Sequence, residues 1–131
     1  MPPRPGEAEL RSLPCSAGHT AFYVSPYGVF YPCVQFPLTW GNVRQQRFAD
    51  IWRNSEQLKE VRSIRVKDLW GCPQCTHVTN CTRCPGLAYM EGNMRGPSIQ
   101  DCEKSFARTG IASVNLQSKK PSVKNLIQIR M

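Results

Sequence analysis

The chain has 131 residues, a length that suits one domain and excludes a barrel enzyme of about 250 residues. Apolar residues make up 40% of the sequence beside nine glycines and eleven prolines, which predicts a thin core and many loops. The seven cysteines exceed ordinary usage but fall short of the roughly 8–10% typical of secreted disulfide scaffolds. The net charge of +8 would suit nucleic acid or an anionic lipid surface, but charge alone identifies no partner.

The sequence also indicates a compartment. No stretch approaches the roughly 18 consecutive apolar residues of a membrane span, and the first residues contain no apolar segment of the signal-peptide kind. We therefore expect a cytoplasmic protein without membrane contact. Thiols stay reduced in the cytosol, so clustered cysteines there bind metals or clusters more often than they form disulfides. The odd number of cysteines indicates the same use.

Two short runs rich in aromatic and β-branched residues, at 19–25 and 29–33, predict a β-hairpin. Between them stands Ser25-Pro26-Tyr27-Gly28, and proline followed two positions later by glycine is typical of a β-turn. Cys15 precedes this hairpin and Cys33 ends it, so the fold-back could bring the two thiols close together.

Between positions 47 and 66, apolar residues recur at the three- and four-residue spacing of amphipathic helix, which predicts two short helices. Asn54, followed three residues later by Gln57, resembles a capping box that would begin the second helix. Phe48 and Trp52 lie on the apolar face of the first helix, and we expect both in the core.

The last predicted elements are helical as well. Residues 86–91 predict one or two turns, stopped by Gly92-Asn93. Ser98 and Asp101 form a second capping-box pattern, which would begin a helix that Gly110 closes. We expect Asp101 to cap this helix rather than to bind iron. Together the elements predict a small, loop-rich α+β fold with an N-terminal hairpin, several short helices and cysteine-bearing loops around two metal clusters.

Composition divides the chain into three parts. Residues 1–14 contain four prolines and no apolar periodicity, which predicts an extended or disordered arm. Residues 15–110 contain every cysteine and form the predicted domain. Residues 111–131 are polar and basic and predict a tail, and their final apolar alternation is too weak to predict a strand.

The spacing of the cysteines indicates their chemistry. Two residues between cysteines allow a tight turn to direct both thiolates at one metal centre, and two such pairs occur here. Structural zinc sites usually leave about 15–20 residues between their pairs, whereas five separate Cys75 from Cys81. A four-iron cluster is larger than one ion, so a single loop could cap three of its irons. The cysteines stand at positions 15, 33, 72, 75, 81, 84 and 102.

The order C-x12-G-x4-C, then C-x2-C-x5-C-x2-C, then a last cysteine resembles the SPASM domain. This is the C-terminal auxiliary-cluster domain of many radical S-adenosylmethionine enzymes, including peptide-modifying maturases and anaerobic sulfatase maturases. The resemblance spans about Cys15 to Arg108, most of the chain. Landmarks around the cysteines match as well: Cys15-Ser-Ala-Gly18, Ser25-Pro-Tyr-Gly28 with Tyr31-Pro-Cys33, Gly41-Asn42, Phe48-Ala-Asp-Ile-Trp52 and Cys81-Thr-Arg-Cys-Pro-Gly86.

The resemblance implies two [4Fe-4S] clusters whose ligand sets cross along the sequence. Four cysteines would bind the second auxiliary cluster completely, and three would bind the first, leaving one of its irons open to a substrate, a water or a residue of a partner. Many relatives also have three residues where two separate Cys81 from Cys84 here. The second set is Cys72, Cys75, Cys81 and Cys102, and the first set is Cys15, Cys33 and Cys84.

The resemblance also implies a function. Radical S-adenosylmethionine catalysis is associated with a C-x3-C-x2-C loop, which this sequence does not contain. We therefore expect no catalysis by the chain alone. The chain would either be a stand-alone protein that supports a radical enzyme in trans, or be the C-terminal piece of a split or truncated gene. The expected role is electron transfer or substrate anchoring during modification of a peptide or protein.

Polar residues near the cysteines leave alternatives open. Arg83, Lys104 and Arg108 would either offset the negative charge of a cluster or face solvent. His77 could replace a thiolate ligand, although seven thiolates make this unnecessary. We expect His19 to be a polar residue at the edge of the hairpin.

A structural zinc protein whose basic tail contacts nucleic acid is the alternative function. The cysteine pairs and the net charge favour it. The short gap between the pairs, and a tail without aromatic residues among its lysines, count against it, so nucleic acid is not the expected partner. A non-functional gene remnant is a third reading.

Overall fold

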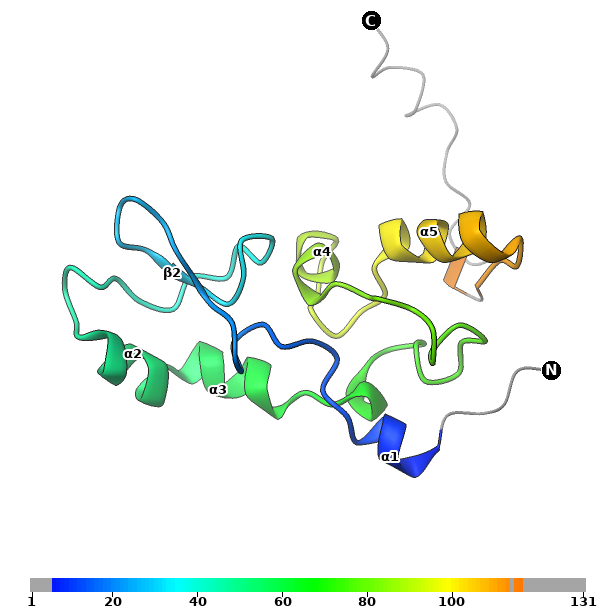
Figure 1. Ribbon diagram of the computed structural model, residues 1–131, viewed down its shortest axis with the longest axis horizontal. Coiled ribbons are helices and arrows are strands. Elements are labelled where there is room, and N and C mark those ends of the chain that lie inside the picture. Colours follow the sequence, from blue (N-terminus) through cyan, green and yellow to red (C-terminus); the bar gives the residue numbers. More distant parts are fainter. Residues whose placement is uncertain (1–5, 114, 117–131) are drawn as a thin grey trace, which may run out of the picture.

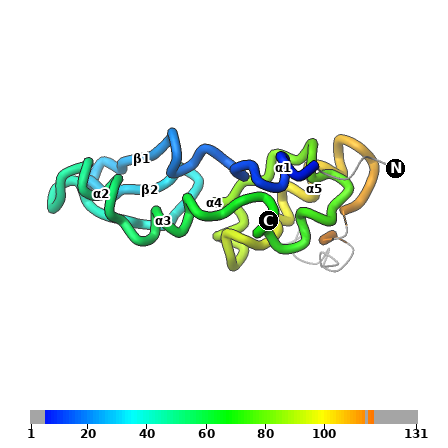
Figure 2. Tube along the Cα trace, turned by 90° about the horizontal axis from the view of Figure 1, so that it is seen from below, coloured from blue at the N-terminus to red at the C-terminus, as the bar shows by residue number. Residues whose placement is uncertain are grey.

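The computed structural model describes residues 6–113, 115 and 116, and its regular elements are short (Figure 1). The predicted α+β class is confirmed, because a two-stranded antiparallel sheet accompanies helices and long cysteine-bearing loops. Figures 1 and 2 show an elongated molecule with the hairpin and α2 towards one end, α4 near the middle and α5 towards the other end. The elements are α1 (Glu7–Leu10), β1 (Tyr23–Val24), β2 (Phe30–Tyr31), α2 (Phe48–Asn54), α3 (Glu56–Ser63), the 3-10 helix η1 (Val66–Asp68), α4 (Pro85–Met90) and α5 (Ile99–Thr109).

The predicted hairpin is confirmed, although each strand has only two residues. β1 and β2 pair with Tyr23 opposite Tyr31. In the turn, the Gly28 N–H donates to the Ser25 carbonyl oxygen at 2.9 Å. Gly28 adopts a φ of 83°, a conformation that side chains with a Cβ rarely tolerate, so glycine is required where the chain reverses.

Both helices predicted between positions 47 and 66 are present, but the predicted cap of the second is wrong. Asn54 is the last residue of α2. Ser55 caps α3 instead, and its hydroxyl accepts a hydrogen bond from the Leu58 N–H at 3.4 Å. Gln57 accepts a bond from the same hydroxyl at 3.1 Å. Helix α3 therefore begins one residue later than predicted, because Ser55 has an extended backbone and supplies the capping oxygen.

The predictions for α4 and α5 are confirmed. α4 ends before Gly92, and α5 begins after Ser98, whose hydroxyl accepts the Asp101 N–H at 3.3 Å. Gly110 closes α5 in the left-handed conformation with a φ of 71°. These ends are local features of the chain, which explains why sequence patterns locate them.

Two small apolar clusters form the core among the described residues, in line with the thin core that composition predicts. Leu58 and Val61 of α3 belong to different clusters, so this helix connects them. One cluster lies at the hairpin and the other extends towards the cysteine loops. The first contains Phe30, Trp40, Ile51 and Leu58, and the second contains Ala17, Phe36, Val61, Ile64, Leu69 and Met94.

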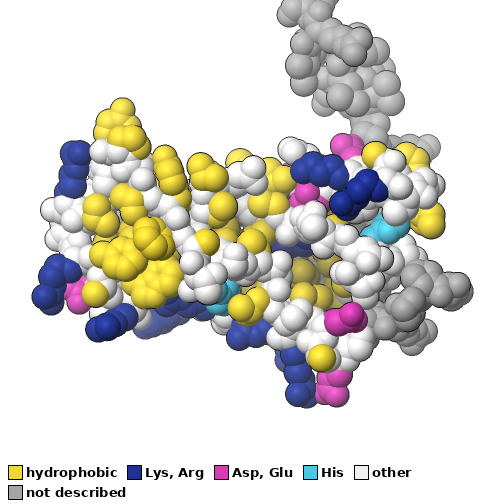
Figure 3. Space-filling view, viewed as in Figure 1, with side chains coloured by type: hydrophobic (Ala, Val, Ile, Leu, Met, Phe, Trp, Pro, Cys, Tyr) yellow, Lys and Arg dark blue, Asp and Glu magenta, His cyan; other side chains and the backbone are white. Residues whose placement is uncertain are grey.

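The expectation that Phe48 and Trp52 are core residues is wrong for Phe48, which is 41% exposed, and Trp52 is only partly buried. Both rings contact the exposed Phe22, with centroid distances of 5.0 and 5.8 Å. The Arg62 guanidinium group lies over the Trp52 ring, 4.4 Å from its centroid. Figure 3 shows apolar side chains gathered on the surface at this end of the molecule.

The ends of the chain differ partly from the predicted arm and tail. The arm is not extended throughout, because residues 7–10 form α1, and the Val66 N–H donates to the Ser12 carbonyl at 3.1 Å. Of the predicted tail, Ser113 is buried, whereas the weak apolar alternation at 123–131 lies outside the described residues. No helix in the described part of the chain is long and apolar enough to cross a membrane.

Candidate functional site

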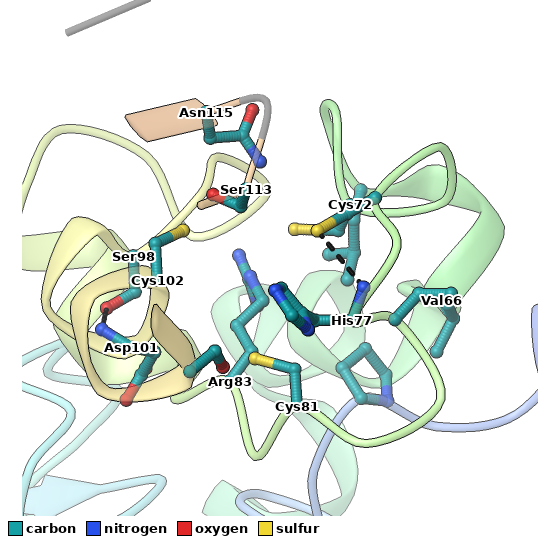
Figure 4. Close-up of a pocket in the computed structure, with 15 residues that line it drawn as sticks. Val66, Cys72, His77, Cys81, Arg83, Ser98, Asp101, Cys102, Ser113 and Asn115 are labelled. Carbon is teal, nitrogen blue, oxygen red and sulfur yellow. Dashed lines mark hydrogen bonds between the residues drawn. The ribbon is translucent and has the colours of Figure 1, made fainter. Parts of the chain in front are cut away.

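A pocket between the loop that follows η1 and helix α5 contains four of the seven cysteines in its wall (Figure 4). Its empty space is about 580 Å³, a volume that includes the part open to solvent. The four cysteines are the set that the family resemblance assigns to the second auxiliary cluster. They are Cys72, Cys75, Cys81 and Cys102.

Successive turns of the loop bring three of these thiols to one side. The Cys75 N–H donates to the Cys72 carbonyl at 3.0 Å, and the Cys81 N–H donates to the His77 carbonyl at 2.8 Å. The His77 N–H points at the Cys75 Sγ, 3.4 Å away. Backbone N–H groups directed at a thiolate sulfur stabilise its charge, so the His77 N–H favours a thiolate at Cys75.

The fourth thiol comes from α5 on the opposite wall. Cys102 is 9% exposed, and its N–H donates to the Ser98 carbonyl at 2.9 Å. Ser113, only 1% exposed, lines the same wall and hydrogen-bonds the Cys102 thiol. Tertiary packing of α5 against the loop, rather than any local motif, therefore completes the set of four.

Burial in this pocket disfavours the deprotonated form of a cysteine unless a positive charge lies beside it. Burial raises the pKa of the Cys72 thiol to about 11, and the nearby Arg83 acts against this rise. Burial also raises the pKa of Cys102, against the effect of its hydrogen bond with Ser113. Thiolates form here when a cation compensates their charge, and bound iron is such a cation.

Arg83 is buried, so the alternative in which it faces solvent is wrong. Its guanidinium group enters the pocket among Cys72, Cys81 and Cys102 (Figure 4). One nitrogen, Nη1, is buried without a hydrogen-bond partner among the described residues. Four thiols around an unpaired cationic donor fit an anionic sulfur-rich cluster bound at this place.

The expectation that Asp101 caps α5 is wrong, because the Ser98 hydroxyl is the cap. The Asp101 carboxylate is buried and accepts the Cys84 N–H at 2.7 Å. Its other oxygen contacts the Lys104 ammonium group at 3.3 Å. Asp101 thus ties the segment with Cys84 to the helix with Cys102, a link across 17 positions that no local pattern indicates.

Replacing Asp101 with alanine is expected to lower the free energy of unfolding by about 1.5–3 kcal/mol, because the partly buried Cys84 N–H loses a charged acceptor. Asp101→Asn keeps an oxygen acceptor and should lose less. Denaturant unfolding of the full chain measures both. Asp50 lies on the surface beside Arg47, so Asp50→Ala is the control, with a change of about 0.5 kcal/mol or less. Equal losses for Asp50→Ala and Asp101→Ala would contradict this role.

The other three cysteines lie in neighbouring loops rather than in one pocket of the described structure. Cys84 caps α4, and its thiol points at the Gln35 side-chain oxygen, 3.6 Å away. Cys33 lies in the turn just before Gln35, where its carbonyl accepts the Phe36 N–H at 3.0 Å. Cys15 is exposed and borders a smaller hollow that Phe36 and Arg83 also line.

The remaining polar candidates have structural roles. His77 lines the larger pocket, but its Nε2 lies 2.8 Å from the Ile111 carbonyl oxygen, to which it donates. Lys104 and Arg108 are on the surface, where they contact Asp101 and Ser105. His19 is half-buried, and burial together with Arg65 and Arg62 lowers its pKa.

Fold and site together define a small, loop-rich cysteine domain in which tertiary packing gathers thiols from distant segments. Within residues 6–113, 115 and 116, no three His, Cys, Asp or Glu side chains converge closely enough to hold a single metal ion. Four thiols nevertheless line the larger pocket.

Residues 15–85 match the SPASM family, described as an iron-sulfur cluster-binding domain, and the chain belongs to this family. The resemblance inferred from the cysteine spacing is therefore confirmed. The match includes every cysteine except Cys102, which lies beyond its end. The structure places this residue in the same pocket wall as three cysteines inside the match.

Three curated relatives bear the name AdoMet-dependent heme synthase. The protein of Methanosarcina barkeri is 34% identical over 82 residues, which cover 62% of this chain and 23% of the relative. That of Nitratidesulfovibrio vulgaris is 33% identical over 87 residues, covering 66% and 23%. That of Oleidesulfovibrio alaskensis is 34% identical over 70 residues, covering 53% and 18%. The matched part of this chain thus spans less than a quarter of each relative, and no solved structure matches.

Proposed function

We propose that the chain is an auxiliary module that holds two [4Fe-4S] clusters for a radical S-adenosylmethionine enzyme. The observation that carries the proposal is the pocket in which a short loop and a distant helix present four thiols. Cys72, Cys75, Cys81 and Cys102 would bind one cluster there. Membership of an iron-sulfur family supports this use of the sulfur.

Cys15, Cys33 and Cys84 would bind the other cluster, with one iron left for a ligand from outside this set. Contacts between their loops support the grouping. The Cys84 thiol points at Gln35, two residues after Cys33. Pro85 borders the smaller hollow together with Cys15. When bound, such clusters supply one-electron carriers and an iron that can take a further ligand.

The radical core would be a separate protein or another part of a longer chain, because the sequence of 131 residues contains no C-x3-C-x2-C loop. In this arrangement the module transfers electrons or anchors a substrate while the core modifies a peptide or protein. The cytoplasm is the matching compartment, since it keeps thiols reduced. The names of the relatives favour a haem precursor as a second candidate substrate.

Anaerobic reconstitution with iron and sulfide tests the proposal. We expect a brown protein with about eight irons and eight sulfides per chain, as two four-iron clusters require. Metal analysis, sulfide assay and electron paramagnetic resonance of the reduced protein provide the measurement. A colourless protein that binds stoichiometric zinc and no sulfide would contradict the proposal and favour the zinc alternative.

A further inference from the structure

The side chain of Arg83 is fixed in the pocket wall by backbone carbonyl groups. It is 9% exposed, although its neighbours in sequence lie in a polar loop. Nε donates to the Gly96 carbonyl at 3.1 Å, and Nη2 donates to the carbonyls of Met94 and Gly96. These bonds set the plane of the guanidinium group and leave Nη1 as its remaining nitrogen.

Nη1 is buried and has no hydrogen-bond partner within the described part of the chain. An arginine does not lose its proton in a protein, so Nη1 is a buried donor of a charged group. Such a donor is costly unless an acceptor satisfies it. Figure 4 shows the guanidinium group directed into the space bordered by Cys72, Cys81 and Cys102.

The groups around Arg83 indicate what this acceptor is. Cys72, Cys81 and Asp101 line the pocket together with Arg83. Asp101 already contacts the Cys84 N–H and Lys104. The remaining neighbours are therefore thiols of the proposed cluster site. A cluster bound by four thiolates is anionic, and its sulfurs accept hydrogen bonds.

We propose that Arg83 is a cofactor-binding residue, whose Nη1 donates a hydrogen bond to a sulfur of the cluster held by Cys72, Cys75, Cys81 and Cys102. The bond and the fixed positive charge favour the reduced, more negative cluster, so they raise its reduction potential. The inference rests on the proposed function, because it requires that this cluster forms.

The first test compares Arg83→Gln and Arg83→Lys with the unchanged protein after anaerobic loading. Titration with dithionite, followed by electron paramagnetic resonance, gives the potential of each cluster. In Arg83→Gln, the ratio of reduced to oxidised protein at a fixed potential should fall about tenfold for one cluster, a shift of about 59 mV for one electron. Arg83→Lys keeps the charge without the planar fork and should show a smaller fall.

Arg108→Gln is the matched control. It removes the same charge from the surface of α5, where Arg108 donates a hydrogen bond to the Ser105 hydroxyl. Both potentials should then stay at the values of the unchanged protein, because solvent screens an exposed charge. A shift in Arg108→Gln as large as in Arg83→Gln would overturn the role of the directed donor.

A second test uses the unchanged sequence and does not depend on the folding of a variant. Protein labelled with 15N-arginine is loaded and reduced, and pulsed electron paramagnetic resonance measures nitrogen coupling to the clusters. We expect weak 15N coupling to one cluster, and its loss in Arg83→Lys expressed with the same label. Should Arg83→Gln fail to fold, the presence of this coupling would support the proposal and its absence would overturn it.

The outcomes separate this inference from the proposed function. A protein that takes up no iron and sulfide contradicts the proposed function itself. A protein that holds both clusters, shows no 15N coupling and keeps its potentials in both Arg83 variants overturns only the inference. Coupling together with a lowered potential of one cluster supports both.

Discussion

Replacing Cys102 with alanine is expected to remove one cluster and leave the other, so that the iron content falls from about eight to about four per chain. Cys102 is the only thiol that α5 brings to the larger pocket. Without it the three remaining ligands all come from one loop, and the facing wall formed by α5 offers no thiol to hold the cluster in place, whereas the three ligands of the first cluster come from separate segments. Because metal binding is coupled to folding, the segment from Cys72 to Arg108 should also lose protection against hydrogen exchange.

Cys15→Ala is the complementary variant for this prediction. Cys15 is exposed and lies outside the larger pocket, so its removal should leave the second cluster bound. Iron and sulfide assays with hydrogen exchange of the loaded proteins provide the comparison. About eight irons retained in Cys102→Ala, or identical exchange patterns for both variants, would contradict the division of the cysteines into two sets.

Gly86→Ala is expected to lower the free energy of unfolding by about 3 kcal/mol or more, the upper range for overpacking. A Cβ at this position would lie 2.2 Å from the Gln35 carbonyl oxygen and 2.9 Å from the Phe36 Cα. Both are backbone atoms, so neither can rotate away. The clash would also move the turn that carries Cys33 away from Cys84, which should weaken the first cluster selectively.

Helix propensity makes this prediction sharp, since alanine is the better helix former by about 1 kcal/mol and Gly86 lies inside α4. Only steric conflict can reverse that gain. Gly6→Ala is the control, because a Cβ at that position would have no atom within 4 Å. Thermal and denaturant unfolding measure both variants. A Gly86→Ala protein as stable as the original would show that α4 does not pack against the Gln35 turn.

Local sequence signals were sufficient for most of the secondary structure. Helix α5 begins after the hydroxyl cap of Ser98 and ends at the left-handed Gly110, and both signals act within a few residues. Gly28 likewise sets the hairpin turn by itself. The misplaced cap at Asn54 shows the limit of this reading, because the neighbouring Ser55 offered an equally good oxygen one residue later.

Burial was less predictable than the elements themselves. Phe48 follows the apolar spacing of a helix, and its ring packs beside those of Phe22, Phe30 and Trp52, yet it is 41% exposed. Arg83 is the opposite case. A charged residue in a polar loop is buried because the carbonyl groups of Met94 and Gly96 receive its guanidinium group.

The sequence by itself determined the family, the short helices and the hairpin, because spacing, caps and turns are properties of neighbouring residues. The family resemblance implied which four thiols belong together, whereas tertiary structure alone decided that Asp101 holds the Cys84 segment and that Arg83 points among the sulfurs. Those relations join positions far apart in the chain. They arise only when α5 packs beside the cysteine loop, and no local pattern encodes that packing.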